Sequence, residues 1–205
     1  MSDVGKILDL YFVTNKLKNV LRQGWLNWQV EGVRVESIAE HIYGTLMLAV
    51  SICANTNQDV DMYKVSLMLA LHEIEEIIIG DIAFFDIERA KTKKEDGKKA
   101  VNQIFANCIN KQEFLDIIAE FEECKTKEAR FAKACDKLEA DLQAYLYRDD
   151  FNYNKVNPLF YEDDRIKDFI ARGKTKVHQM FIDNDKTYYY GIFNELINEL
   201  ESKDK

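Results

Sequence analysis

Apolar residues recur every three or four positions along most of the chain, which is the period of a helix with one buried face. Leu10, Val13 and Leu17 begin this pattern and predict a helix over about residues 3–21. The segment from Trp25 to Arg34 carries two tryptophans and lies near glycines, so it is predicted to be an ordered loop able to line a pocket. The chain is therefore expected to open with a helix followed by a loop.

The next two predicted helices begin at recognisable caps. Ser37 and Glu40 have the spacing of a capping box, so a helix is predicted to start at Ser37, with His41 in its first turns. Asp61 and Gly80 mark the expected start and end of a third helix. Residues three or four positions apart on a helix point to the same side, so His72 and Glu76 are predicted to project together from this third helix.

The same period continues to the end of the chain. Helices are predicted over about residues 112–123 and 126–147, and in the tail near 163–171, 175–182 and 187–200. One proline and eight glycines leave long stretches without helix breakers. The fold class is therefore predicted to be all-α.

The domain organisation is predicted to be simple. We find no internal repeat, low-complexity tract or shift in composition that would mark a second domain. The prediction is one domain over residues 1–205, with a motif-bearing core over about 20–150 and a C-terminal helical extension over about 151–205.

Charge and cysteine usage limit the possible partners and location. A net charge of −8 opposes binding to duplex nucleic acid, whose phosphates need lysine and arginine. No apolar run is long enough to span a membrane. The four cysteines show no CxxC spacing and no secretory signal is evident, so we expect reduced thiols in the cytoplasm.

The histidines and a few acids carry the candidate chemistry. Only three histidines occur, and two of them, His41 and His72, join Glu73 and Asp136 as a possible ligand set. Manganese, cobalt, iron and zinc accept imidazole nitrogen together with carboxylate oxygen, whereas calcium does not suit this set. Asp136 is unusual inside a helix, because aspartate competes for backbone hydrogen bonds, and metal ligation explains its position.

For each of these residues alone another interpretation stays open. The histidines could be hydrogen-bonded core residues, and the glutamates could form a solvated helix face. Glu73, Glu75 and Glu76, however, place three like charges in four positions beside the apolar run 77–79. Such crowding costs repulsion and desolvation unless a cation offsets it, which favours a metal site.

The motif segments resemble those of the HD-domain metal-dependent phosphohydrolases. The likeness is greatest to small bacterial 5'-deoxynucleotidase-like proteins and their eukaryotic HD-domain-containing relatives. It covers about residues 20–150. The segments that carry it follow in order: Gly24-Trp25, Glu36 to His41, Leu71 to Glu76, Gly80-Asp81-Ile82 and Lys133 to Asp136. The resemblance implies an all-helical HD-domain bundle, usually a homodimer.

The resemblance also implies the metal ligands, which are His41, His72, Glu73 and Asp136. The family's doublet is histidine-aspartate, whereas the carboxylate of Glu73 reaches one methylene further, which leaves metal preference and activity open. Only His178 remains outside the motif, so the histidine-rich two-metal sites of some relatives cannot be assembled in the usual way. One divalent transition metal, manganese, cobalt, iron or zinc, is the expected cofactor.

Catalytic and substrate-binding roles follow from the same resemblance. Asp81 is assigned to water activation and Glu76 to proton handling, although Asp81 could instead cap a segment and Glu76 could be solvated. Trp25 is implied to contact the base or the deoxyribose, although a tryptophan is more often part of the core. The family's arginine directly precedes this tryptophan, but here Gly24 takes that place and Arg22 is the nearest substitute.

The implied function is a 5'-nucleotidase that hydrolyses deoxyribonucleoside 5'-monophosphates to deoxyribonucleoside and phosphate. One alternative is a deoxynucleoside triphosphate hydrolase on the same scaffold. Another is a non-catalytic nucleotide-binding or regulatory module, motivated by the His72-Glu73 doublet, and a third is a helical interaction protein, motivated by the tyrosines at 188–190. Lys91, Lys93 and Lys94 could attract an anionic substrate or form a solvated surface run.

Overall fold

The structure is a computed structural model that describes residues 2–83, 86–152, 155 and 177–203. Within this part of the chain the secondary structure is helical, with two isolated bridges between extended residues, Leu21 to Ser37 and Val30 to Phe151. The all-α prediction is confirmed. The helices are α1 Asp3–Thr14, the 3-10 helix η1 Asn15–Asn19, α2 Gln23–Asn27, α3 Ile38–Asn55, α4 Met62–Leu71, α5 Glu76–Ile79, α6 Ile87–Ile104, α7 Lys111–Glu123, α8 Lys127–Leu146, α10 Val177–Asp185, the 3-10 helix η4 Lys186–Tyr188 and α11 Ile192–Lys203.

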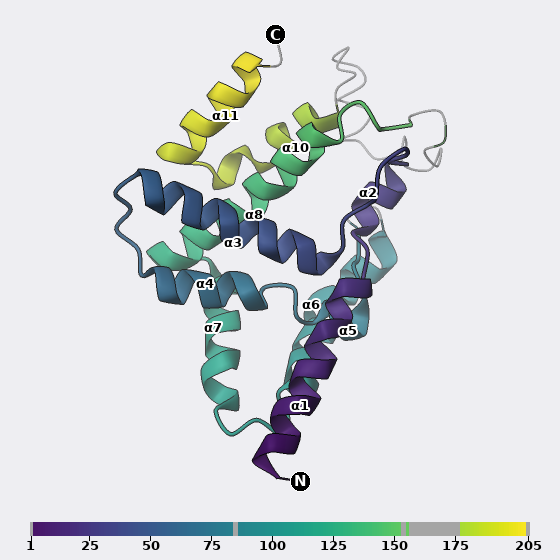
Figure 1. The fold of residues 1–205 in the computed structure, drawn as a ribbon, viewed down its shortest axis with the longest axis vertical. Helices are drawn as coiled ribbons and strands as arrows, with labels where there is room; N and C mark the ends of the chain where they lie inside the picture. The colour runs from purple at the N-terminus through teal and green to yellow at the C-terminus, as the bar shows by residue number, and fades with distance from the viewer. Residues whose placement is uncertain (1, 84–85, 153–154, 156–176, 204–205) are drawn as a thin grey trace.

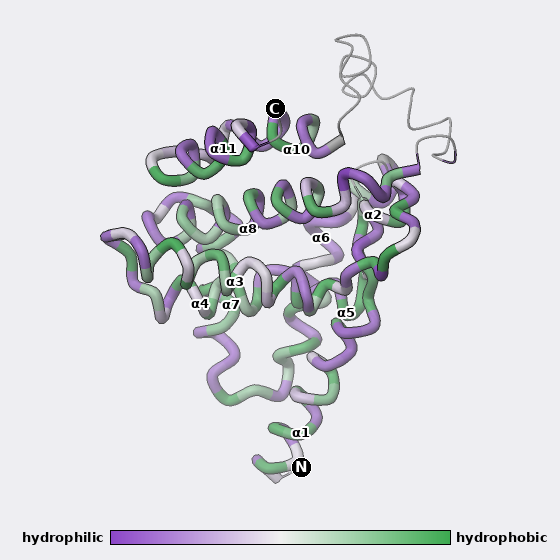
Figure 2. The backbone as a smooth tube through the Cα atoms, turned by 45° about the horizontal axis from the view of Figure 1, so that its top comes forward, coloured by the Kyte–Doolittle hydropathy of each residue, from purple (hydrophilic) through white to green (hydrophobic). Residues whose placement is uncertain are grey.

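Helix α8 lies at the centre of the bundle and packs against α3, α4, α7 and α10 (Figure 1). Its buried alanines, among them Ala132 and Ala140, leave room for neighbouring helices to approach closely. Met68 from α4, Phe131 from α8 and Phe193 from α11 belong to the same apolar core. Figure 2 shows hydrophobic and hydrophilic residues alternating along the helices, as expected for elements with one buried face.

Two predicted segments differ in the structure. The expected loop from Trp25 begins inside the short helix α2, and the chain becomes irregular only after Asn27. The expected third helix stops at Leu71 and resumes as α5, which ends at Gly80 with φ 71°, a left-handed conformation that glycine adopts freely. On a continuous helix adjacent residues point about 100° apart, so the interruption after Leu71 lets two neighbours face one site.

Other boundaries follow the predictions more closely. The first helix ends at Thr14 and continues as the 3-10 helix η1, and Lys91, Lys93 and Lys94 lie within α6. Helices α7 and α8 match the predicted spans. The predicted helix near 163–171 lies outside the described residues, and the division of the chain into a core and an extension stays a prediction.

Helix α3 is, among the described helices, long and apolar enough by length and composition to cross a membrane. It packs against both α4 and α8, and its buried residues include His41 and Thr45. The core helix of a bundle passes the same test of length and composition. The packing of α3 against two neighbouring helices places it in the bundle, where it carries His41.

Candidate metal centre

Local sequence fixes the direction of His41. Ser37 accepts a hydrogen bond from the backbone N–H of Glu40, and the Glu40 carboxylate accepts one from the Ser37 N–H at 2.8 Å, so the predicted capping box is confirmed. Helix α3 therefore begins at Ile38, which places His41 in its first turns with the imidazole towards α8. The His41 side chain is completely buried.

His72 and Glu73 come from the interruption that follows α4. His72 is the C-cap residue that directly follows Leu71, the last residue of α4, and its Nδ1 lies 2.8 Å from the backbone carbonyl of Leu69. A carbonyl can only accept, so Nδ1 carries the proton and Nε2 presents its lone pair to the interior. Asp136 extends from the middle of α8, as predicted, and is 4% exposed.

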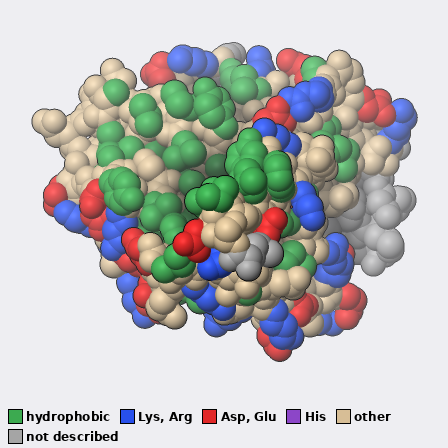
Figure 3. Space-filling view, turned by 60° about the horizontal axis from the view of Figure 1, so that its bottom comes forward, with side chains coloured by type: hydrophobic (Ala, Val, Ile, Leu, Met, Phe, Trp, Pro, Cys, Tyr) green, Lys and Arg blue, Asp and Glu red, His purple; other side chains and the backbone are tan. Residues whose placement is uncertain are grey.

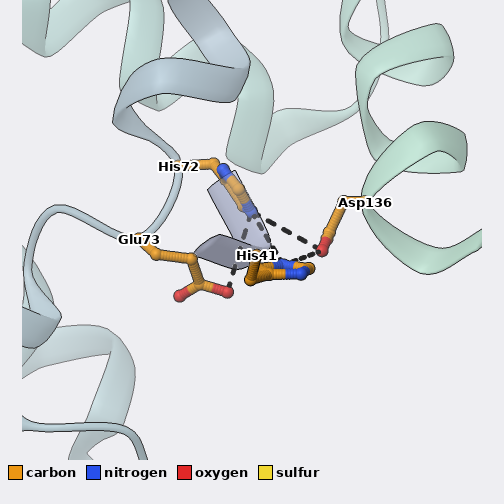
Figure 4. A group of neighbouring side chains, drawn as sticks. All are labelled: His41, His72, Glu73 and Asp136. Atoms are coloured by element: carbon orange, nitrogen blue, oxygen red, sulfur yellow. Dashed lines mark hydrogen bonds and ion pairs between the residues drawn. The ribbon is translucent and has the colours of Figure 1, made fainter. Parts of the chain in front are cut away.

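These four side chains converge from three parts of the chain (Figure 4). One donor atom from each of them lies within 4.8 Å of the others. Nε2 of His41 is 3.3 Å from Nε2 of His72 and 3.3 Å from Oδ1 of Asp136. Nε2 of His72 is 3.6 Å from the same oxygen and 3.9 Å from Oε1 of Glu73. The structure thus brings together all four predicted ligands.

The spacing of these atoms fits a single divalent ion. Two donors that each lie about 2.1 Å from one cation are separated by about 3.0 Å in octahedral and about 3.4 Å in tetrahedral geometry. The three shorter separations are close to these values, and the longer one belongs to Glu73, whose side chain has rotatable bonds that can bring its carboxylate nearer. Two imidazoles and two carboxylates are donors that manganese, cobalt, iron and zinc accept.

The close packing of charged groups shifts the pKa values of His41, Glu73 and Asp136. Burial and the Arg22 cation favour neutral His41, but hydrogen bonds to acidic partners outweigh them and raise the pKa of His41 to about 9. Burial would raise the pKa of Asp136, but Lys137 and the two histidines hold it well below its usual range. Burial likewise opposes the lowered pKa of Glu73, which is about 2 because His72 and Lys93 outweigh it. The centre thus collects anionic donors in the interior.

Glu76 lies beside this centre and is 1% exposed. Burial, followed by the negative charges of Glu73 and Asp81, raises the pKa of Glu76 to about 10. Nζ of Lys93 donates to Oε1 of Glu76 at 3.2 Å, while Oε2 has no hydrogen-bond partner among the described residues. Lys93 therefore turns inward and offsets part of the glutamate crowding, whereas Lys91 pairs with a neighbour on the surface of α6.

Asp81 and Arg22 connect the centre to α2. Oδ2 of Asp81 accepts from the backbone N–H of Gln23 at 2.5 Å, in the first turn of α2. The Arg22 guanidinium lies 4.0 Å from Oε1 of Glu73 and 3.8 Å from Oε1 of Glu36. Burial would lower the pKa of Arg22, but the surrounding carboxylates raise it, so this cation is fixed among acids. Arg22 therefore contacts a predicted ligand directly, while Asp81 caps the start of α2 and acts by its charge on Arg22 and Glu76.

Trp25 is placed differently from the predicted substrate contact. Its side chain is 2% exposed and packs with Tyr147, Phe151 and Phe181. Its indole N–H donates to Oε1 of Glu36 at 2.7 Å. The ring is therefore a core tryptophan rather than a free stacking surface, because its faces are already covered by aromatic neighbours.

Sequence reasoning missed three side chains on α8. Nζ of Lys133 and Nζ of Lys137 lie 3.4 Å and 3.7 Å from Oδ2 of Asp136, and Glu139 contacts His41. For Lys133 and Glu139 the available signal was their spacing of three residues from Asp136, since residues three or four apart on a helix share a face. Lys137 directly follows Asp136, so only the structure shows that its long side chain turns back to the carboxylate.

Comparisons with known proteins agree with this arrangement. Residues 14–174 match a family model described as HD domain. The 5'-deoxynucleotidase HDDC2 of Dictyostelium discoideum is 28% identical over 206 residues, covering 97% of this chain and 98% of that protein. The Xenopus laevis protein of the same description is 32% identical over 152 residues, covering 72% of this chain and 73% of that protein.

A solved structure shows the same architecture. A protein described as a predicted metal-dependent phosphohydrolase, from Magnetospirillum magnetotacticum MS-1, superposes with a TM-score of 0.62. It is 25% identical, and the match covers 91% of this chain and 94% of that one. The similarity to an HD domain model and to a predicted metal-dependent phosphohydrolase therefore agrees with a metal centre at the four converging side chains.

Proposed function

Because the chain belongs to the HD domain family, we propose that it is a metal-dependent 5'-deoxynucleotidase, which hydrolyses deoxyribonucleoside 5'-monophosphates to deoxyribonucleosides and phosphate. The observation that carries the proposal is the convergence of His41, His72, Glu73 and Asp136 within 4.8 Å. Relatives described as 5'-deoxynucleotidases support the substrate class, one of them over 97% of this chain. The substrate is a small molecule.

The four ligands would hold one divalent transition metal. When bound, such an ion neutralises phosphoryl oxygens and acidifies water, which is the chemistry that phosphate ester hydrolysis needs. Manganese, cobalt, iron and zinc all fit the donors, and we propose that Glu73, with its longer reach, selects among them.

The acids beside the centre divide the proton transfers. In hydrolysis a water oxygen bonds to phosphorus, the bond from phosphorus to the 5' oxygen breaks, and that oxygen takes up a proton. Asp81 is assigned to accept the proton of the attacking water. Glu76, whose pKa is raised to about 10, is a neutral acid at pH 7 and is suited to donate to the leaving oxygen.

Three cations provide anion recognition around these acids. Arg22 lies on the α2 side of the centre, and Lys133 and Lys137 lie on the α8 side near Asp136. Both lysines are partly exposed, so their ammonium groups can contact the phosphoryl oxygens of a nucleotide. Trp25 contributes indirectly, by holding Glu36 beside Arg22.

Phosphate release from a panel of ribo- and deoxyribonucleotides, with and without chelator, tests this function. We expect manganese- or cobalt-dependent release of inorganic phosphate from deoxyribonucleoside monophosphates and none in excess chelator. Release of triphosphate or pyrophosphate from deoxynucleoside triphosphates would instead identify the triphosphate hydrolase. Nucleotide binding without turnover would identify a non-catalytic module.

We also propose that the protein is a homodimer that acts in the cytoplasm. Helix α1 has no buried residue, and large apolar side chains on it are exposed, namely Val4, Ile7, Leu8, Tyr11 and Phe12. Figure 3 shows hydrophobic side chains gathered around a hollow on the face from which α1 projects. Exposed apolar patches of this kind favour association. The four cysteines are free, which suits a reducing compartment.

Light scattering tests the dimer. We expect twice the mass of one chain for the wild type and the mass of a single chain for Ile7→Glu combined with Phe12→Glu. Lys6→Glu, a charge change at a polar position of the same helix, serves as the control. A wild type that is monomeric at all concentrations would contradict the proposal.

A further inference from the structure

The ring of His41 is held from both of its nitrogens. Nε2 faces Asp136 and His72, while Nδ1 lies 2.5 Å from Oε2 of Glu139. Glu139 is 8% exposed and His41 is completely buried, so this second contact lies in the protein interior. Glu139 is on α8, three residues after Asp136, so one helix supplies both a ligand and the residue behind another ligand.

This contact decides which nitrogen of His41 can bind a metal. A histidine that binds a metal does so as a neutral imidazole, with one N–H and one lone pair. An ionised carboxylate is only an acceptor, so it places the N–H on Nδ1 and leaves the lone pair on Nε2. The hydrogen bond also fixes the rotation of the ring, so Nε2 stays directed at the other three ligands.

Gly44 makes the position of Glu139 possible. A Cβ atom built on Gly44 would lie 2.3 Å from Oε1, 2.9 Å from Cδ and 3.0 Å from Cγ of Glu139. Any side chain at residue 44 would therefore displace the carboxylate, which has little room to move because it is buried. Glycine is unfavourable inside a helix, so a close approach of this kind explains its place in the middle of α3.

We propose that Glu139 is the positioning residue of His41 and that Gly44 provides the space for it, so that both set the affinity of the centre for its divalent ion. The inference rests on the metal centre of the proposed function and extends it by two residues outside the ligand set. Such hydrogen bonds to ligating histidines contribute about 10- to 100-fold to metal affinity.

A cation bound behind His41 is the alternative, because donor atoms of Glu36, His41 and Glu139 lie within 4.8 Å of one another. The existing contacts favour support of the ring instead. Oε1 of Glu36 already accepts from the Trp25 indole at 2.7 Å and has the Arg22 guanidinium 3.8 Å away. Nδ1 of His41 already donates to Glu139.

The test measures metal binding without turnover. Mn²⁺ affinity and stoichiometry are measured by calorimetry, and the visible spectrum of bound Co²⁺ reports the ligand geometry. The variants are Glu139→Ala, Glu139→Gln and Gly44→Ala. Controls are Glu128→Gln, a buried glutamate at the start of α8, and Gly97→Ala, a glycine inside α6 where a Cβ meets only ordinary contacts, the nearest at 3.4 Å. Circular dichroism confirms that each variant is folded.

We expect Glu139→Ala and Gly44→Ala to weaken Mn²⁺ binding by about 10- to 100-fold and to change the Co²⁺ spectrum. Glu139→Gln keeps an amide oxygen that can accept from Nδ1 and is expected to lose less affinity. Both controls should bind as the wild type does. If Glu139→Ala does not fold, the comparison of Gly44→Ala with Gly97→Ala decides.

Two results would overturn the inference while leaving the metal centre in place. One is unchanged affinity and spectrum in the folded Glu139 and Gly44 variants, with the ion lost in His41→Ala. The other is a stoichiometry of two ions per chain with one of them lost on mutation of Glu36. A wild type that binds neither Mn²⁺ nor Co²⁺ would overturn the metal centre and, with it, this inference.

Discussion

Nε2 of His41 and Oδ1 of Asp136 lie 3.3 Å apart, although 95 residues separate them along the chain. Helices α3 and α8 carry these residues and pack against each other in the bundle. The contact therefore depends on the tertiary fold, and it places a histidine and an aspartate where they can share one cation.

Glu73 stands where the family's doublet has an aspartate. Two substitutions test its role as a ligand, one that removes its charge and one that shortens its side chain. Glu73→Gln should weaken Mn²⁺ binding by at least about tenfold, because a neutral amide is a poorer donor to a cation than a carboxylate. Glu73→Asp should keep the affinity closer to that of the wild type and change the order of preference among Mn²⁺, Co²⁺ and Zn²⁺. Calorimetry with each metal measures both effects.

Glu75→Gln is the control for this prediction, since Glu75 lies two residues away and is absent from the converging set. If Glu73→Gln bound metal as tightly as the wild type, Glu73 would not be a ligand.

Glu76 and Asp81 should affect turnover more than metal binding. Glu76→Gln and Asp81→Asn are each expected to lower kcat by about 10²- to 10⁴-fold, the usual contribution of general acid–base catalysis. Metal content, measured by mass spectrometry, should stay near that of the wild type. Full activity in either variant would remove that residue from the proposed proton transfers, and loss of the metal would reassign it to the centre.

The raised pKa of Asp141 should make the stability of the fold depend on pH, independently of catalysis. Burial raises its pKa to about 8, and Tyr189 donates a hydrogen bond to it. Asp136 and Lys137 on α8 and Asp185 on α10 are the other charged groups that act on Asp141. Because the pKa in the folded state exceeds the ordinary value, the protonated form contributes stability at low pH. That contribution should fall as pH rises from about 4 to 8.

Urea unfolding of the wild type and Asp141→Asn across this range measures the effect. The asparagine variant keeps the shape and loses the titration, so its free energy of unfolding should decline less between pH 5 and pH 8. The difference should amount to a few kcal/mol at most, since one pKa unit corresponds to about 1.4 kcal/mol. Parallel profiles for the two proteins would show that Asp141 does not titrate as described.

Local signals predicted much of the fold. The capping box at Ser37 placed His41 correctly, because a cap depends on residues three positions apart and needs no tertiary information. Glycine with positive φ at residue 80 ended its helix where predicted. The break after Leu71 was not predicted, because the apolar pattern continues through it and the interruption serves contacts with distant residues.

Local signals also predicted part of the candidate site. The ligand types and their motif indicated a metal, and the structure confirms that they converge. The spacing of Glu139 from Asp136 was a local signal that the two share a helix face, but the contact of Glu139 with His41 joins residues 98 positions apart and depends on the tertiary fold. Trp25 was expected at the substrate because of the family resemblance and its place in a loop predicted to line a pocket, but the aromatic residues that bury it come from much later in the chain.

The most direct test of the central claim is the number of divalent ions bound per chain in the wild type, Asp136→Ala and His178→Gln, measured by Co²⁺ titration with calorimetry. We predict one ion per chain in the wild type, none in Asp136→Ala and one in His178→Gln, whose histidine lies outside the converging set. Binding of one ion by folded Asp136→Ala with the affinity of the wild type would contradict the account.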